Sequence, residues 1–133
     1  MNNNIINEFR ASQNPVQAEA MAAYMKNRFP FLGLTRPERN RLQKEFIKDC
    51  KQTAQIDWAL VDACWNLAER EYQYLAVDYL IALKQNLKES DLEKIEGLIT
   101  RKPWWDTVDA IADKLVGYLC LRFPELIDDY IMK

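Results

Sequence analysis

Residues 58–83 read WALVDACWNLAEREYQYLAVDYLIAL, and this stretch predicts two helices joined by a short polar junction at residues 68–71. Apolar residues recur here every three or four positions, the spacing that places side chains on one helix face. Such a short connection is typical of two helices that pack antiparallel to each other. The apolar residues of the two faces are Trp58, Leu60, Val61, Cys64, Trp65 and Leu67, then Tyr72, Leu75, Ala76, Tyr79, Leu80 and Leu83.

A second pair of helices is predicted before this stretch. Asn14 and Pro15 have the pattern of an N-cap residue followed by a first-turn proline, and they predict a helix to about Asn27. Thr35 begins the sequence TRPE, which is a capping-box pattern and predicts a helix that ends near Cys50. These two helices form the first predicted hairpin.

A third pair is predicted after the stretch. Ser90 begins the sequence SDLE, another capping-box pattern, and Pro103 opens a long helix that runs to about Leu121. The pairs therefore begin near residues 15, 56 and 91, a spacing of 35 to 41 residues that overlaps the period of HEAT-type helical repeats.

The sequence thus predicts an all-α fold in which antiparallel helix pairs stack as HEAT-like repeats. Residues 1–133 form one helical-repeat domain of about three pairs. Pro124 starts a further helix without a partner, so we expect the chain to be truncated relative to a complete repeat array. An uncapped repeat edge would also make self-association plausible, because stacked repeats bury their apolar surface only against neighbours.

The composition excludes several classes of protein. With 49% apolar residues, three glycines and five prolines in 133 residues, the chain is globular, and no apolar run is long enough to span a membrane. No signal peptide is evident, so we expect a cytoplasmic protein whose three cysteines are reduced core residues. The absence of histidine excludes His-based nucleophile pairs and His-ligated zinc, and no motif indicates a nucleotide cofactor. We therefore predict neither a metal nor a cofactor.

Charge is unevenly distributed along the chain. Residues 26–51 contain eight basic and three acidic residues, a net charge of +5, whereas the other residues contain 10 basic and 17 acidic ones, a net charge of −7. Such asymmetry can mark a surface that faces phosphate groups. The alternative, a solvated helix face in an acidic protein, is equally compatible with the charges alone.

The helix that Pro103 opens contains the residues best suited to chemistry. At 100° per residue, Trp104, Val108, Ile111 and Leu115 form a core stripe, while Trp105 and Asp109 lie together on another side. An indole beside a carboxylate suits a cationic ligand. The structural alternative is that Trp105 packs against a neighbouring repeat and that the aspartates form an ordinary acidic surface. Those aspartates are Asp106, Asp109 and Asp113.

Three segments in order resemble the AlkD-like DNA glycosylases. They are AAYMKNRFPFLGL with the following RPER at residues 22–39, WNLAEREY at 65–72 and KPWWDTVD at 102–109. The resemblance implies a helical superhelix whose concave basic face holds duplex DNA and excises positively charged N3- and N7-alkylated purines. It further implies that Trp105 and Asp109 are the catalytic pair and that Tyr24 lies close to the lesion, while later repeats of the family supply another Trp and an Arg.

The basic segment adds candidates for DNA contacts. Its members could bind phosphates and set the position of the DNA without reading its sequence. The candidates are Arg36, Arg39, Arg41, Lys44 and Lys48.

The residue types suit this reaction without histidine. An alkylated purine is already cationic, so it can leave as a neutral base without a general acid. Positive charge develops on the sugar, where Asp109 can stabilise it and position water, while Trp105 contributes an aromatic face. Two alternatives remain open: a non-catalytic helical-repeat module that binds DNA or a protein, and an inactive fragment of the enzyme.

Overall fold

The computed structural model describes residues 3–53, 55–102 and 104–125; for residues 3, 4 and 105 it describes the backbone alone. The described helices are α1 (Asn3–Ala11), α2 (Pro15–Tyr24), α3 (Arg36–Cys50), α4 (Trp58–Asn66), α5 (Arg70–Ala82), α6 (Leu92–Thr100), α7 (Trp105–Ala110) and α8 (Gly117–Arg122). A π-helical segment, η3 (Ile111–Val116), joins α7 to α8, and the short 3-10 helices η1 (Lys84–Asn86) and η2 (Glu89–Asp91) precede α6.

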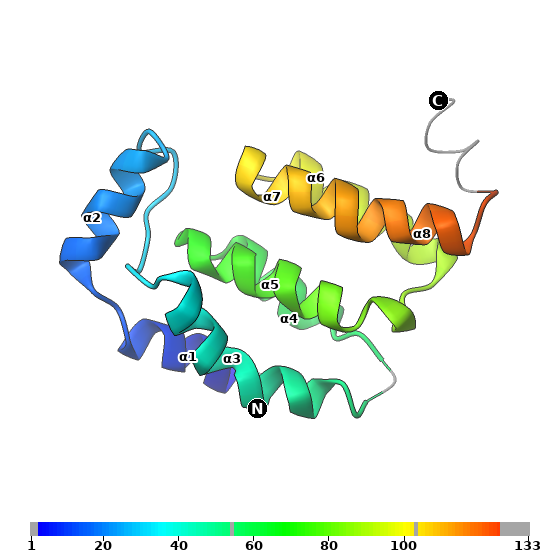
Figure 1. Ribbon diagram of the computed structural model, residues 1–133, viewed down its shortest axis with the longest axis horizontal. Helices are drawn as coiled ribbons and strands as arrows, with labels where there is room; N and C mark the ends of the chain where they lie inside the picture. Colours follow the sequence, from blue (N-terminus) through cyan, green and yellow to red (C-terminus); the bar gives the residue numbers. More distant parts are fainter. Residues whose placement is uncertain (1–2, 54, 103, 126–133) are drawn as a thin grey trace.

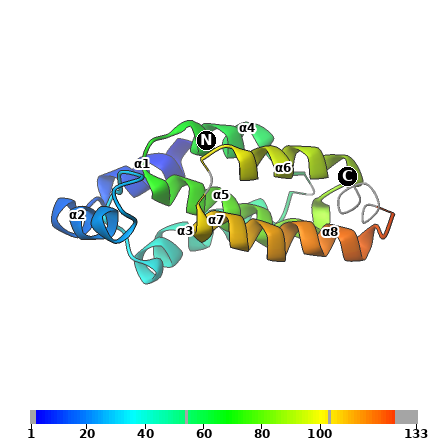
Figure 2. The ribbon, with the colours of Figure 1, turned by 90° about the horizontal axis from the view of Figure 1, so that it is seen from above.

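The helices stack as antiparallel pairs, and the predicted all-α repeat fold is confirmed. α1 packs against α3, α4 against α5, and α6 against η3, while α5 contacts both α3 and the α7–η3 segment. In Figure 1, α1 and α3 lie lowest, α4 and α5 lie above them, and α6 lies with the α7–α8 segment above α4 and α5. Figure 2 shows two layers: α1, α4 and α6 form one, and α3, α5 and the α7–α8 segment form the other.

The first pair differs from the prediction. It consists of α1 and α3, whereas the sequence predicted that the helix beginning at Pro15 would pair with α3. α1 was not predicted, yet its Ile5 and Phe9 are buried in the core. α2 has no buried residue and ends at Tyr24, because Lys26 and Asn27 adopt positive φ angles of 57° and 58° that stop the helix before its predicted end.

Two of the three predicted caps are confirmed. Asn14 accepts a hydrogen bond from the backbone N–H of Gln17, and Thr35 forms a reciprocal capping box with Glu38. The predicted cap at Ser90 is wrong, because η2 occupies that position and α6 begins at Leu92 without a side-chain cap. The carboxylate next to Ser90, that of Asp91, instead accepts a hydrogen bond from the backbone N–H of Lys88 at 2.8 Å.

The last predicted helix is continuous, but its central part is π-helical rather than α-helical. It begins at Trp105 rather than at Pro103, which lies outside the described residues, and continues through η3 to Arg122. Trp104 is the N-cap residue in an extended conformation, so it does not belong to the helical core stripe as predicted. Ile111 and Leu115 of that stripe are fully buried. The helix predicted after Pro124 falls on residues 126–133, outside the described part of the chain.

The core is built largely from the faces predicted for residues 58–83. Trp65, Tyr72, Leu75 and Leu80 are each fully buried. Of the predicted core thiols, Cys64 is buried and free, whereas Cys50 and Cys120 are free but only partly buried. Within the described ranges, no helix is long and apolar enough to cross a membrane.

A buried carboxylate fastens the segment between α2 and α3 to α5. Glu71 is fully buried and accepts hydrogen bonds from the backbone N–H groups of Leu32, Gly33 and Leu34 at 2.8, 2.9 and 3.1 Å. Gly33 has a φ of +95°, and a Cβ atom there would lie 2.1 Å from the carbonyl oxygen of Asn14. Only glycine fits this close approach, so the segment presents three consecutive donors to one carboxylate.

We expect Glu71→Gln to lower the free energy of unfolding by about 3 kcal/mol, because the neutral amide loses charge-assisted hydrogen bonds and turns a donor toward other donors. Urea denaturation followed by circular dichroism measures this change. Glu93→Gln, at an exposed site on α6, is the matched control and should change the free energy by less than about 0.5 kcal/mol. Equal effects of the two variants would contradict the anchoring role of Glu71.

Candidate functional site

Asp109 is an exposed residue of α7, in the layer that also contains α3 and α5. It makes no hydrogen bond or ion pair with any residue that the structure describes. Trp105 begins α7 one turn earlier, and its side chain lies outside the described residues. The carboxylate predicted to act in catalysis is therefore exposed and has no partner among the described residues.

The neighbouring carboxylate of Asp106 has a structural role. Arg70 is fully buried and donates from Nε and Nη2 to the two carboxylate oxygens of Asp106, at 3.0 and 2.7 Å. The same guanidinium donates to the hydroxyl of Thr107 at 2.7 Å and to the carbonyl oxygen of Lys102 at 3.0 Å. Such a bidentate pair fixes both direction and distance, so Arg70 holds the first turn of α7 against α5.

Tyr74 joins this cluster from the next turn of α5. Its hydroxyl donates a hydrogen bond to Asp106, and its ring lies 4.7 Å from the guanidinium carbon of Arg39. Burial raises the pKa of Tyr74 well above its usual range, and the hydrogen bond to Asp106 and the charge of Asp106 raise it further. Tyr74 is therefore a neutral hydrogen-bond donor at physiological pH.

Tyr24 lies at the edge of a shallow cavity next to this cluster. The cavity has a volume of about 300 Å³ and lies between α2, α5 and the start of α7. Tyr24 is 76% exposed, and Tyr74 and Asp106 line the same cavity. Its other lining residues are Ala20, Met21, Met25 and Phe31. The structure thus places the predicted lesion contact beside the residues that anchor α7.

The basic residues of α3 fall into two groups. Arg36 and Arg39 both lie next to Asp78 of α5. Arg39 is buried, with 8% exposure, and its guanidinium lies over the ring of Tyr74. Arg39 is therefore unavailable to a phosphate, and we leave it out of the proposed DNA contacts. The other three, Arg41, Lys44 and Lys48, are exposed and recur at helical spacing on one side of α3.

Several side chains hold the segment that leads into α7, residues 101, 102 and 104. The indole of Trp65 donates to the carbonyl oxygen of Arg101 at 2.8 Å, and the ammonium of Lys102 donates to the carbonyl oxygen of Leu67 at 2.6 Å. Arg28 lies over the ring of Trp104, with its guanidinium carbon 4.0 Å from the ring centroid. The segment that leads into α7 is therefore held from α4, from the connection before α5 and from the segment after α2.

The sequence analysis missed the roles of Arg70 and Glu71. Both were placed in a polar junction, yet both are fully buried in the first turn of α5. An apolar pattern cannot reveal buried charges whose partners lie 36 and 38 residues away along the chain. The only sequence signal for these roles was the charged pair itself, which directly precedes the apolar residues of 72–83.

Metal-binding groups are not evident in the described part of the chain. Among those residues, no group of three or more acidic or cysteine side chains could hold a metal ion.

The fold and the site define a class: an α–α repeat protein with a firmly anchored helix that presents an exposed carboxylate. A family model described as DNA alkylation repair enzyme matches residues 5–131. The chain belongs to this family. A solved structure described as a predicted DNA alkylation repair enzyme from Enterococcus faecalis is similar, with 32% sequence identity and a TM-score of 0.75. The similarity covers 86% of this chain and 54% of that chain, and none of the curated proteins compared with it matches.

The two aspartates of α7 should respond differently to the same substitution. Asp106→Asn leaves the buried charge of Arg70 without its counter-charge, so we expect a loss of about 3 kcal/mol or more in the free energy of unfolding. Asp109→Asn should change it by less than about 0.5 kcal/mol, because that side chain is exposed. Urea denaturation compares the two. A comparable loss in both variants would contradict the division between anchor and free carboxylate.

Tyr74 should also make stability depend on alkaline pH. Because its pKa is raised in the folded protein, its stabilising contribution is complete below the unfolded pKa of 10.0 and is lost as the pH rises above that value. We expect Tyr74→Phe to lose stability less steeply than the parent chain above pH 10.0. Urea denaturation over a pH series measures both slopes, and parallel slopes would contradict the prediction.

Proposed function

We propose that this chain provides the N-terminal part of a DNA glycosylase that hydrolyses the N-glycosidic bond of positively charged N3- and N7-alkylated purines in duplex DNA. The observation that carries the proposal is the contrast between Asp106, which pairs with Arg70, and Asp109, which is exposed on the same anchored helix and pairs with no described residue. The anchored first turn holds Asp109 in a fixed position, as a catalytic carboxylate requires.

The reaction requires a carboxylate but no acid. As the bond between the sugar C1′ and the purine nitrogen breaks, its electron pair passes to the cationic base, which leaves neutral. Asp109 stabilises the positive charge that develops on the sugar and orients a water molecule, whose oxygen bonds to C1′ as its proton passes to solvent. Trp105 contributes an aromatic face to the cationic sugar or base.

The DNA would lie against the layer formed by α3, α5 and α7. Arg41, Lys44 and Lys48 are exposed on α3 and would contact phosphates, with Arg36 as a weaker contributor because of its ion pair with Asp78. Tyr24, beside the cavity near Asp106, would contact the lesion. These contacts position the duplex without selecting a sequence.

The extent of the chain bears on how complete this site is. The chain spans 54% of the length of the Enterococcus faecalis chain that it resembles. In a stacked-repeat protein the DNA surface is distributed over successive repeats, so further helices would add contacts. Whether residues 1–133 suffice for the reaction is therefore measured on this chain alone.

We expect the chain to release 7-methylguanine or 3-methyladenine from alkylated duplex DNA, and Asp109→Asn to slow that release by at least about 100-fold. Single-turnover release is followed by chromatography, and DNA affinity by fluorescence anisotropy. Affinity should stay similar or rise in the variant, because the substitution removes a negative charge near phosphates.

Asp113→Asn is the matched control, since Asp113 is also exposed and lies one turn further along the same helical segment. It should leave the release rate within about twofold of the parent chain. DNA binding without release by the parent chain would overturn the proposed activity and favour a DNA-binding module. A joint loss of affinity and release in Asp109→Asn would assign Asp109 to binding instead.

A further inference from the structure

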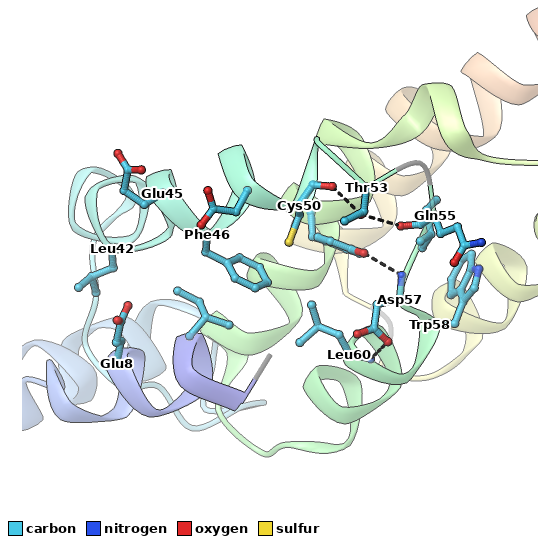
Figure 3. A pocket seen from close by; sticks show the side chains of 14 residues that line it. Glu8, Leu42, Glu45, Phe46, Cys50, Thr53, Gln55, Asp57, Trp58 and Leu60 are labelled. Atoms are coloured by element: carbon cyan, nitrogen blue, oxygen red, sulfur yellow. Dashed lines mark hydrogen bonds between the residues drawn. The ribbon is translucent and has the colours of Figure 1, made fainter. Parts of the chain in front are cut away.

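A second and larger groove opens away from the proposed DNA site. It has a volume of about 990 Å³ and is lined by α1, α3, residues 53 and 55–57, the start of α4 and one residue of α5. Figure 3 shows that α1 and α3 form its two sides at one end, and that Phe46 and Cys50 extend from α3 into the space between the helices. Neither Asp109 nor Tyr24 lines this groove.

The floor of the groove is apolar and incompletely covered. Leu42, Phe46, Ile56 and Trp58 line it and are each only partly buried, although they pack against the core. The ring of Phe46 lies 6.3 Å from that of Tyr79, which forms the deeper part of the floor. Apolar side chains that are buried on one side and open on the other favour an apolar occupant.

The rim of the groove is acidic. Glu8, Glu45 and Asp49 are exposed, and Asp57 lines the groove while it caps α4 by accepting a hydrogen bond from the N–H of Leu60. Of the 14 described residues that line the groove, four are acidic and none is basic. Glu8, Glu45 and Asp49 form no ion pair with any described residue. The resulting field attracts cations and repels phosphates.

The surface of α3 is divided into three adjacent stripes. At 100° per residue, one stripe contains the cations Arg41, Lys44 and Lys48, and the next contains Glu45 and Asp49. The third stripe is the apolar one that faces the groove, with Leu42, Phe46 and Cys50. The acidic stripe therefore separates the groove from the cations that we assign to DNA.

We propose that this groove docks a basic amphipathic peptide segment of a partner protein. The apolar side chains of the segment would cover the floor around Phe46 and Trp58, and its lysine or arginine side chains would pair with Glu8, Glu45 and Asp49. The ammonium of Lys94 already lies 5.0 Å from the ring centroid of Trp58, so this part of the floor accepts a cation over an aromatic face.

The dimensions and charge of the groove distinguish among possible occupants. Its volume of about 990 Å³ is at the upper end for a small-molecule pocket, and its lining comes from segments that lie far apart in the sequence, as suits a peptide. Nucleic acid is disfavoured by the four carboxylates. Since the basic stripe of α3 is separate, the peptide and the DNA bind at the same time, and neither depends on the proposed glycosylase activity.

The probe is a fluorescein-labelled amphipathic peptide of about four helical turns, built from leucine and lysine, and its counterpart carries glutamate in place of every lysine. Fluorescence anisotropy should show that the full chain binds the lysine peptide and not the glutamate peptide. Glu45→Lys with Asp49→Lys should weaken binding at least about tenfold, because two attractions become repulsions.

The matched control is Glu19→Lys with Glu93→Lys, which changes the net charge equally at two exposed sites outside the groove. This control should weaken binding by less than about threefold, a long-range effect that salt screens. Equal weakening in the two double variants would overturn the proposal, since the attraction would then come from net charge alone. Circular dichroism confirms that both variants are folded.

A second measurement places the peptide without any charge variant. Cys50 lines the groove, whereas Cys120 is similarly part-buried in α8 outside it. The lysine peptide should slow alkylation of Cys50 by iodoacetamide at least about threefold and leave Cys120 unchanged, as read by peptide mass spectrometry. Binding that protects neither thiol, or both equally, would overturn the assignment of the groove.

Discussion

Two buried charges in the first turn of α5 hold the proposed site together. Arg70 binds Asp106 and Thr107 of α7, and Glu71 binds three backbone N–H groups in the segment between α2 and α3. The two side chains therefore join segments that lie before and after α5 in the sequence. Buried charges are costly unless every donor and acceptor is matched, and here the matching requires all three segments to take one arrangement. This constraint fixes where α7 begins.

The fixed start of α7 decides which aspartate can take part in chemistry. Asp106 accepts from Arg70 and Tyr74, so its charge is already compensated. Asp109 lies almost one turn further and remains exposed, two residues before the start of the π-helical segment η3. π-helical turns are rare and are often found at functional sites, because the wider turn changes the faces that the flanking residues present. The anchor and the proposed catalytic group are thus two different carboxylates of one short motif.

Basic and acidic side chains of α3 lie on different sides of the helix, although the segment as a whole is basic. The net charge of −2 conceals a basic stripe on α3, an acidic stripe beside it and an apolar stripe that lines the large groove. Arg36 and Arg39 of the same basic segment both lie next to Asp78 of α5, and Arg39 is buried there, so fewer cations face solvent than the segment contains. The result is two surfaces of opposite charge, one suited to phosphate groups and one suited to a basic partner.

The sequence by itself determined the helical class, the helix pair at residues 58–83 and the caps at Asn14 and Thr35. These features depend on neighbours within one or two turns, through apolar period and side-chain capping. It also predicted Asp109, on the helical spacing and on the resemblance of the motif. Tertiary structure alone decided that α1 rather than α2 completes the first pair, because α1 buries Ile5 and Phe9 whereas α2 buries nothing. Tertiary structure also decided that Asp106 binds Arg70 and that Arg39 is buried next to Asp78. The partner of each charge lies more than 30 residues away along the chain, so no local pattern reveals it.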